Sequence, residues 1–336
     1  MSNVENRNPP DSELNKLFNL YSTRDFSGAE NFCKNLLTTY PDSAACLNIL
    51  GVIFEAQGKS KEALVAYENT IRKNPEYLDV YHNAGILLNT LGRVEEAVEK
   101  FGKAVELNPE DFDARNNIGV LLQKLNRHEE SLAHLSKAVN LSPNNASGFF
   151  NYANSLKAIG KDDAALENYN QAVRLDPAFS VAFNNRGNLL ESMKRYEDAR
   201  RSYTRAIELD RSYVSAYSNR GVVEKKLGNY PGAAKDFTKA TELDPWQPEN
   251  PSQDRNFKFR LYVNLGDIQM YFGEYSRALD SYDTAAEIEP ESSDVLAFKG
   301  NALAALGNLS EGLLLRQKSF GFICFDVSEG VSIIHG

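Results

Sequence analysis

The sequence contains few of the residues and strings that most often mark an enzyme. It has four histidines in 336 residues, and it lacks the H-E-x-x-H, C-x-x-C, G-x-S-x-G and P-loop patterns of common catalytic and metal sites. The histidines are His82, His128, His134 and His335. Adjacent carboxylates such as Glu95 and Glu96 fall near expected helix starts, where the helix dipole favours negative charge. We therefore expect no enzyme activity, no catalytic residue, no metal ion and no cofactor.

Cysteine and long apolar stretches are also scarce. The three cysteines, Cys33, Cys46 and Cys324, are odd in number and widely spaced, which argues against a disulfide framework and for thiols in a reducing compartment. No stretch of 18 apolar residues occurs, and residues 1–11 lack the apolar core of a signal peptide. We expect a cytoplasmic protein with no membrane partner.

Positive charge is not in excess. The chain has 37 lysines and arginines against 46 aspartates and glutamates, so its formal net charge is −9. Binding to nucleic acid through phosphates needs a clustered basic face. We therefore expect no nucleic-acid partner.

The sequence does contain a regular repeat with a period of 34 residues. A glycine or alanine recurs at Gly51, Gly85, Gly119, Ala153, Gly187 and Gly221 and, after a break, at Gly266 and Gly300. When this residue is counted as position 8, position 20 is mostly small, position 24 mostly aromatic, position 27 mostly alanine and position 32 mostly proline. Apolar residues within each period recur at helical spacing, as in Ala97, Phe101 and Val105. The pattern predicts a pair of helices in each period.

This pattern resembles the tetratricopeptide repeat (TPR) family. The resemblance implies an all-α fold, a right-handed TPR α-solenoid, which is a superhelix of antiparallel helix pairs whose first helices line the concave side. The small residue lets the two helices of a repeat approach, the aromatic residue fills the space beside them, and proline ends the second helix. Because a repeat array has no single globular core, we expect one elongated domain.

The period also sets the expected boundaries. Residues 1–9 form a disordered tail, residues 10–320 a solenoid of about nine repeats, and residues 321–336 a β-hairpin or cap. The repeats are 10–43 (degenerate), 44–77, 78–111, 112–145, 146–179, 180–213, 214–247, then an insert at 248–258, 259–292, and 293–320 (atypical). We expect the insert near Trp246 to lead into a longer helix capped near Ser252 or Asp254. The hairpin can fold over the last helix or pair with another chain, and we expect it to act as a cap.

Asparagine is the feature that packing does not require. Position 6 is asparagine in six successive repeats, although asparagine is a poor helix former. These residues are Asn83, Asn117, Asn151, Asn185, Asn219 and Asn264; position 5 adds Asn48, Asn116 and Asn184, and position 9 adds Asn154, Asn188 and Asn301. Positions 6 and 9 are neighbours on one helix face. Two interpretations stay open: a row of ligand-binding amides, or amides that bond to the neighbouring helix.

A carboxamide offers both a donor and an acceptor, which match the C=O and N–H of a peptide unit. First helices about 10 Å apart and an extended chain rising about 3.3 Å per residue would bring one amide to about every third residue of a bound segment. We expect micromolar-range binding of extended or disordered protein segments. The expected peptide-binding residues are Asn83, Asn117, Asn151, Asn154, Asn185, Asn188, Asn219 and Asn264.

The row is similar to the asparagine ladder in the repeat domain of O-linked N-acetylglucosamine transferases, where position-6 asparagines hold the substrate backbone. Only residues 321–336 follow the last repeat, so we expect no catalytic domain in this sequence. Two classes of function remain. One is a non-catalytic scaffold that binds extended segments in the concave groove and can self-associate as a homo-oligomer. The other is a substrate-targeting subunit or arm of a glycosyltransferase or other protein-modifying enzyme.

A second family comparison concerns the carboxylate clamp of TPR co-chaperones. The best register in this sequence gives Asn184, Asn188, Asn219, Arg260 and Asn264. Two of the cations that the clamp needs are absent, so we do not expect a C-terminal carboxylate as ligand. The later repeats carry Lys157, Lys225, Lys226 and Arg260, whereas the earlier ones carry Asp79 and Asp113. This gradient would either orient an acidic segment or be a solvated mixture of charges.

Overall fold

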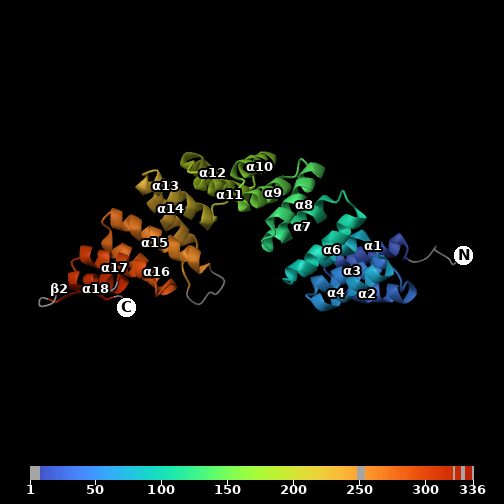
Figure 1. Cartoon of the computed structure of the whole chain (residues 1–336). Coiled ribbons are helices and arrows are strands. Elements are labelled where there is room, and N and C mark those ends of the chain that lie inside the picture. Colours follow the sequence, from blue (N-terminus) through green and yellow to red (C-terminus); the bar gives the residue numbers. More distant parts are fainter. Residues whose placement is uncertain (1–7, 248–253, 321, 327–329, 335–336) are drawn as a thin grey trace. The chain divides into compact units, whose positions relative to one another are not determined.

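The computed structural model describes residues 8–247, 254–320, 322–326 and 330–334. These residues form eighteen α-helices in succession, followed by two short strands (Figure 1). Consecutive helices pack as pairs joined by short turns. The predicted all-α TPR solenoid architecture is confirmed. By its internal contacts the chain divides into two compact units, Met1–Leu175 and Asp176–Gly336.

Unit 1 contains five helix pairs. Its first helices are α1 (Asp11–Ser22), α3 (Ala44–Ala56), α5 (Leu78–Thr90), α7 (Phe112–Lys124) and α9 (Ala146–Ala158). Its second helices are α2 (Phe26–Thr39), α4 (Ser60–Lys73), α6 (Val94–Leu107), α8 (His128–Leu141) and α10 (Asp162–Leu175). From α3 to α9, each first helix begins at the residue at which the 34-residue period starts a repeat.

Unit 2 contains four helix pairs and the strands. Its first helices are α11 (Ser180–Ser192), α13 (Val214–Lys226), α15 (Arg255–Tyr271) and α17 (Ser293–Ala305). Its second helices are α12 (Tyr196–Leu209), α14 (Tyr230–Leu243), α16 (Tyr275–Ile288) and α18 (Leu309–Phe320). Strands β1 (Phe322–Asp326) and β2 (Gly330–Ile334) pair in antiparallel register, with Phe322 opposite Ile334. A capping role for this hairpin stays a prediction.

One residue in each turn between paired helices has a left-handed backbone. It is always position 15 of the repeat, and it is glycine in six repeats, as in Gly58 with φ of 74°. Arg24, Asn126 and Lys194 adopt the same conformation with φ of 57° to 63°. Glycine takes this conformation without steric cost, whereas a residue with a Cβ does not. The turn therefore explains why glycine also recurs at position 15 of the repeats.

The glycine at position 8 lies directly against the large residue at position 24. A Cβ built on Gly187 would stand 2.5 Å from the Tyr203 ring, and one on Gly51 would stand 2.3 Å from the Tyr67 ring. These rings, like the alanines at positions 20 and 27, are fully buried. The close approach of the two helices in a repeat therefore depends on a missing side chain, as the repeat pattern predicts.

The insert changes the start of α15. Residues 248–253 lie outside the described part of the chain. Asp254 caps α15, because its side chain accepts a hydrogen bond from the Phe257 N–H at 3.0 Å. The helix is 17 residues long and begins four residues before Phe259, the expected start of the repeat. Both the longer helix and one of its two expected caps, Asp254, are confirmed.

The insert and the N-terminal end of the chain show packing that the period does not encode. Trp246 is half-buried, its backbone N–H donates to the Tyr262 hydroxyl at 3.0 Å, and the Arg255 guanidinium lies 5.5 Å from its ring. At the N-terminal end, Pro9 is buried and the Ser43 hydroxyl donates to Asn8 at 2.8 Å. Residues 1–7 of the predicted tail lie outside the described residues.

Candidate functional site

All eight predicted site asparagines lie on first helices, and all are half-buried. Unit 1 contributes Asn83 on α5, Asn117 on α7, and Asn151 and Asn154 on α9; unit 2 contributes Asn185 and Asn188 on α11, Asn219 on α13 and Asn264 on α15. First helices of neighbouring repeats contact one another, as α3 with α5, α7 with α9, and α11 with α13, more extensively than second helices do. Within each unit the first helices therefore lie on the inner side of the curvature.

Amides of neighbouring first helices bond to each other by one repeated rule. The position-6 asparagine donates from Nδ2 to Oδ1 of the position-5 asparagine in the preceding repeat. The pairs are Asn83 with Asn48 at 3.0 Å, Asn151 with Asn116 at 2.9 Å, and Asn219 with Asn184 at 3.2 Å. The acceptors Asn48 and Asn184 are buried. Sequence reasoning gave this contact only as the alternative to ligand binding.

The amide pairs occur at every second junction between repeats, because position 5 alternates. Asn48, Asn116 and Asn184 occupy it in one set of repeats, and His82, Phe150 and Ser218 occupy it in the other. His82 instead bonds Asp111 at 2.7 Å and packs edge-on to the Phe101 ring. The side chain of Asn117, in the repeat that follows the His82 repeat, makes no hydrogen bond to another residue of the described chain. The amides on first helices thus fall into a paired and a less constrained class.

Position 9 is held from the second helix of its own repeat. The buried Tyr203 donates its hydroxyl to Asn188 Oδ1 at 2.8 Å, and Tyr169 donates to Asn154 Oδ1 at 2.5 Å. Tyr282 bonds Asp267 in the same way at 3.0 Å. Burial, together with neighbouring carboxylates, raises the pKa of Tyr203 and Tyr282, so both phenols stay protonated donors.

Sequence reasoning missed this role of tyrosine, although a signal was present. Every tyrosine at position 24 meets an amide or a carboxylate: Tyr169, Tyr203 and Tyr282 bond position 9, and the Tyr67 hydroxyl bonds Glu55 at position 12. Position 24 is Phe101, Leu135 or Phe237 in repeats whose position 9 is Ile86, Val120 or Val222. The choice of aromatic residue therefore predicts whether its tip meets a polar partner.

Hydrogen-bonding capacity remains on the amides after these contacts. Each carboxamide has two donor hydrogens and an acceptor oxygen. Within the described residues, Oδ1 of Asn83, Asn151 and Asn219 accepts no hydrogen bond, while their Nδ2 atoms are engaged. The Asn117 carboxamide keeps both its Nδ2 donor and its Oδ1 acceptor available. In each paired amide the Nδ2 bond fixes the side chain, so its Oδ1 is a fixed acceptor. Such an acceptor suits a main-chain N–H group of a ligand.

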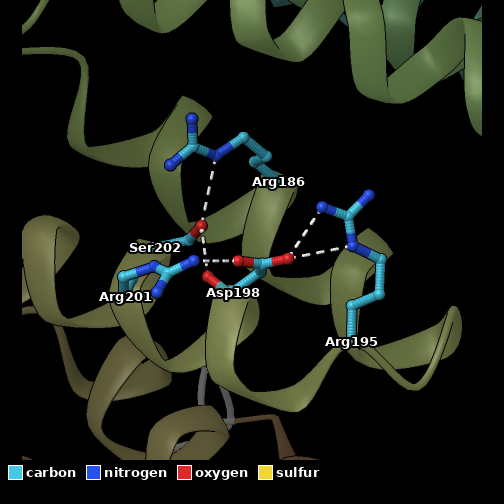
Figure 2. Close-up of polar contacts among 5 residues, drawn as sticks. All are labelled: Arg186, Arg195, Asp198, Arg201 and Ser202. Atoms are coloured by element: carbon cyan, nitrogen blue, oxygen red, sulfur yellow. Dashed lines mark hydrogen bonds and ion pairs between the residues drawn. The ribbon is translucent and has the colours of Figure 1, made fainter.

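A polar network joins α11 to α12 (Figure 2). The Arg186 Nε donates to the Ser202 hydroxyl at 3.1 Å, and Ser202 donates to the Asp198 carbonyl at 3.0 Å. The Asp198 carboxylate accepts from Arg195 at 2.7 Å and from Arg201. These arginines lower the pKa of Asp198, whereas burial lowers the pKa of Arg186. The network positions α11, which carries Asn185 and Asn188.

The next repeat replaces this network with an ion pair. The Arg220 guanidinium on α13 makes two hydrogen bonds of 2.7 Å to the Asp236 carboxylate on α14 and one of 3.1 Å to Thr204. Asp236 is almost fully buried. Two parallel bonds of this kind fix the direction of the guanidinium. Positions 7 and 23 therefore join the first and second helices in both repeats, by an arginine–serine hydrogen bond in one and by an ion pair in the other.

Other predicted features are placed as follows. Cys33 and Cys46 are buried free thiols, and the Cys33 Sγ donates to the Cys46 carbonyl at 3.2 Å. His128 and His134 each hold a buried ring nitrogen without a hydrogen-bond partner in the described structure. Across the described residues, no cluster of three or more histidine, cysteine or acidic side chains has the arrangement of a metal site. No helix in that part combines the length and apolar character needed to span a bilayer.

Comparison with known families identifies the repeats. A family model described as "Tetratricopeptide repeat" matches residues 180–213 and 214–246, and related models with that description match 112–145 and 263–316. A model described as "TPR repeat" matches residues 88–126 and 153–194. Together these matches span more than half of the chain. The chain belongs to the tetratricopeptide repeat family.

Solved structures with the same fold include two bacterial proteins. A tetratricopeptide repeat protein from Parabacteroides merdae is 20% identical, with a TM-score of 0.56, over 77% of this chain and 98% of its own. PilF from Pseudomonas aeruginosa is 21% identical, with a TM-score of 0.52, over 61% of this chain and 88% of its own. At 20–21% identity, the similarity to these two structures shows the fold alone. No curated protein matches the sequence.

Proposed function

We propose that this chain is a non-catalytic scaffold that binds extended segments of partner proteins along the first helices of each unit. One observation carries the proposal: the Asn117 side chain has no hydrogen-bond partner among the described residues, and the side chains of its neighbours Asn83 and Asn151 keep an open Oδ1 acceptor. These three side chains stand at the same repeat position on α5, α7 and α9, and all are half-buried. Their spacing supports contact with one continuous segment.

The amide pairs support this proposal rather than compete with it. An amide whose Nδ2 bonds a neighbouring oxygen has lost rotational freedom before a ligand arrives. Its Oδ1 then binds at a smaller entropy cost than a mobile side chain would. Hydrogen bonds worth about 0.5–1.5 kcal/mol each, offset by the ordering of a flexible ligand, correspond to modest affinity. The proposed ligands are extended or disordered protein segments, and the proposed affinity lies in the micromolar range.

A random peptide library displayed on phage and selected on the intact chain tests the proposal. We expect selected peptides to bind with micromolar Kd, measured by fluorescence anisotropy. Replacing Asn117 with alanine should weaken binding about two- to twelvefold, which corresponds to one lost hydrogen bond. Asn140→Ala is the matched control, because Asn140 is exposed on the second helix α8. Circular dichroism would check that both variants fold.

Two results would count against the proposal. One is that no library peptide binds the wild-type chain. The other is that Asn117→Ala and the triple change of Asn83, Asn117 and Asn151 to alanine bind the selected peptides as well as Asn140→Ala does. The second result would leave the amides with a structural role, in which they bond only to neighbouring first helices.

The likeness to the ladder of O-linked N-acetylglucosamine transferases supports a second candidate, a targeting arm of a protein-modifying enzyme. In this role the same surface would hold a substrate segment while a separate catalytic subunit modifies it. Purification of the tagged chain from its source cells separates the two candidates. A catalytic subunit present in stoichiometric amount supports the targeting arm, and its absence supports the scaffold. Size-exclusion chromatography with light scattering would show whether the scaffold is a homo-oligomer, and cell fractionation would test the cytoplasmic location.

A further inference from the structure

A small polar pocket lies on the first helices of unit 2. It has a volume of about 180 Å³ and is lined by Glu191, Ser218, Asn219, Val222, Phe257, Arg260 and Asn264. Glu191 comes from α11, Ser218, Asn219 and Val222 from α13, and the rest from α15. Pockets for small-molecule ligands usually occupy about 300–1,000 Å³. This pocket is smaller, and its size suits one side chain of a bound polypeptide.

The charges around the pocket leave one cation unmatched. Glu191 pairs with Lys226 at 2.8 Å, and Lys225 pairs with Asp267 at 3.0 Å. Arg260 is exposed, and its guanidinium makes neither an ion pair nor a hydrogen bond with another residue that the structure describes. A guanidinium presents five donors in a planar fork that fits a carboxylate. The pocket therefore has one free positive charge at its mouth.

The remaining polar atoms fix the direction of a ligand. Asn219 uses Nδ2 to bond Asn184 and Asn188, at 3.2 and 2.9 Å, so its Oδ1 is the end left for a ligand N–H. Asn264 donates to the Arg260 carbonyl at 2.9 Å and accepts from Lys225 at 3.2 Å, so both ends of this amide are occupied. Val222 and Phe257 supply apolar walls. The Asn219 Oδ1 atom, the Arg260 guanidinium and this apolar wall together match a main-chain N–H followed by an acidic side chain.

We propose that this pocket binds the carboxylate side chain of an aspartate or glutamate within an extended peptide, with Arg260 as its partner and Asn219 on the adjacent main-chain N–H. The proposal rests on the proposed function and adds a preference for one kind of side chain at one place. A phosphorylated side chain fits less well, because it carries nearly two negative charges and both Lys225 and Lys226 are already paired.

Selection of the random peptide library on four versions of the intact chain tests this inference. Peptides selected on the wild type should share an aspartate or glutamate at one position, and changing that residue to asparagine or glutamine should lower affinity about tenfold or more. Arg260→Gln should bind the acidic and the neutral peptide equally, and Arg260→Glu should select lysine or arginine at that position. Arg277→Gln is the control, because it removes an exposed arginine of the same repeat at a site outside the pocket.

The outcomes separate this inference from the function on which it rests. If peptides bind but share no acidic residue, or if Arg260→Gln keeps the acidic preference, the pocket assignment is wrong and the scaffold function stands. If phosphopeptides of the selected sequences bind more tightly than the acidic ones through Arg260, the choice of carboxylate is wrong. If no peptide binds the wild type, both proposals fail together.

Discussion

Position 15 of each repeat shows how one backbone angle selects a residue. Lys194 occupies this position with φ of 59°, whereas six other repeats place glycine there. A left-handed residue with a Cβ costs about 1–2 kcal/mol, and glycine costs the folded state about 0.5–1 kcal/mol in chain entropy. We predict that Lys194→Gly raises the free energy of unfolding by about 0.5–1 kcal/mol, measured by urea denaturation.

Lys161→Gly is the control for this prediction. Lys161 lies one position after the equivalent left-handed glycine, Gly160, and is not itself among the residues with positive φ. Glycine there gains nothing from the backbone angle and adds disorder to the unfolded chain. We expect it to lower stability. Equal destabilisation by Lys161→Gly and Lys194→Gly would contradict this account of the turn.

His134 predicts a dependence of stability on pH. Burial, with Arg115 and Lys137 nearby, lowers the pKa of His134 below its ordinary value of 6.5. Below pH 6.5 the unfolded chain takes up a proton that the folded chain rejects, so stability should fall from there toward the lower folded pKa. The next repeat has asparagine, Asn168, at the position of His134. We therefore predict that His134→Asn removes this fall in stability below pH 6.5.

The Glu30 carboxylate affects the stability of the fold at lower pH. Lys34 and Lys59 hold the pKa of Glu30 at about 2, against an ordinary value of 4.5. Its contribution is present above pH 4.5 and is lost as the pH falls toward 2. Urea midpoints between pH 4.5 and 6.5 therefore report on His134 rather than on Glu30. If the stability of the wild type and of His134→Asn depends on pH in the same way over this range, His134 is not the source of the pH dependence.

The two helices of a repeat meet at positions 7 and 23, and the chemistry of this contact differs between repeats. In α13 and α14 this contact is the buried pair of Arg220 and Asp236, whereas the repeat 44–77 has Leu50 and Ala66 at the same positions. Removing one member of a buried ion pair typically costs about 3–5 kcal/mol, because the other charge is left buried. We predict a loss of about 3 kcal/mol for Asp236→Ala, measured by urea denaturation.

The double variant provides the control for the ion pair. Arg220→Leu combined with Asp236→Ala reproduces the pair of the repeat 44–77 and leaves no unpaired charge. Replacing a buried pair by apolar residues is often neutral, so the double variant should be more stable than Asp236→Ala alone. A double variant no more stable than Asp236→Ala would contradict the assignment of the loss to an unpaired buried charge.

How far the sequence predicts these elements depends on distance along the chain. Helices α3, α5, α7, α9, α11 and α13 begin at the residues at which the period starts a repeat, because helix starts depend on local turns and packing positions. The period left open whether Asn83 binds a ligand or bonds the neighbouring helix, and its bond to Asn48 joins residues 35 apart. Whether such amides face each other depends on how neighbouring pairs stack, which the pattern within one repeat does not contain. The pocket around Arg260 was missed for the same reason, since three first helices build it.

Across the chain, stability is a sum over neighbouring repeats, and on the proposed function recognition is such a sum as well. In repeat proteins each unit contacts mainly its neighbours, and here the amide contacts also pass from one repeat to the next. Each of the two compact units carries its own set of position-6 amides. On the proposed function, a ligand is held by many weak contacts to its main chain, and a side-chain preference arises only where a repeat departs from the pattern, as at Arg260.

An N-methyl scan of a peptide selected on the wild-type chain tests the claim of main-chain recognition most directly. Each peptide N–H is replaced in turn by N–CH₃, and the Kd is measured by calorimetry. We predict losses of about two- to twelvefold that recur about every third residue and that disappear in the matching asparagine-to-alanine variant. Affinity that tolerates N-methylation at every position, yet falls when side chains are changed, would contradict the account.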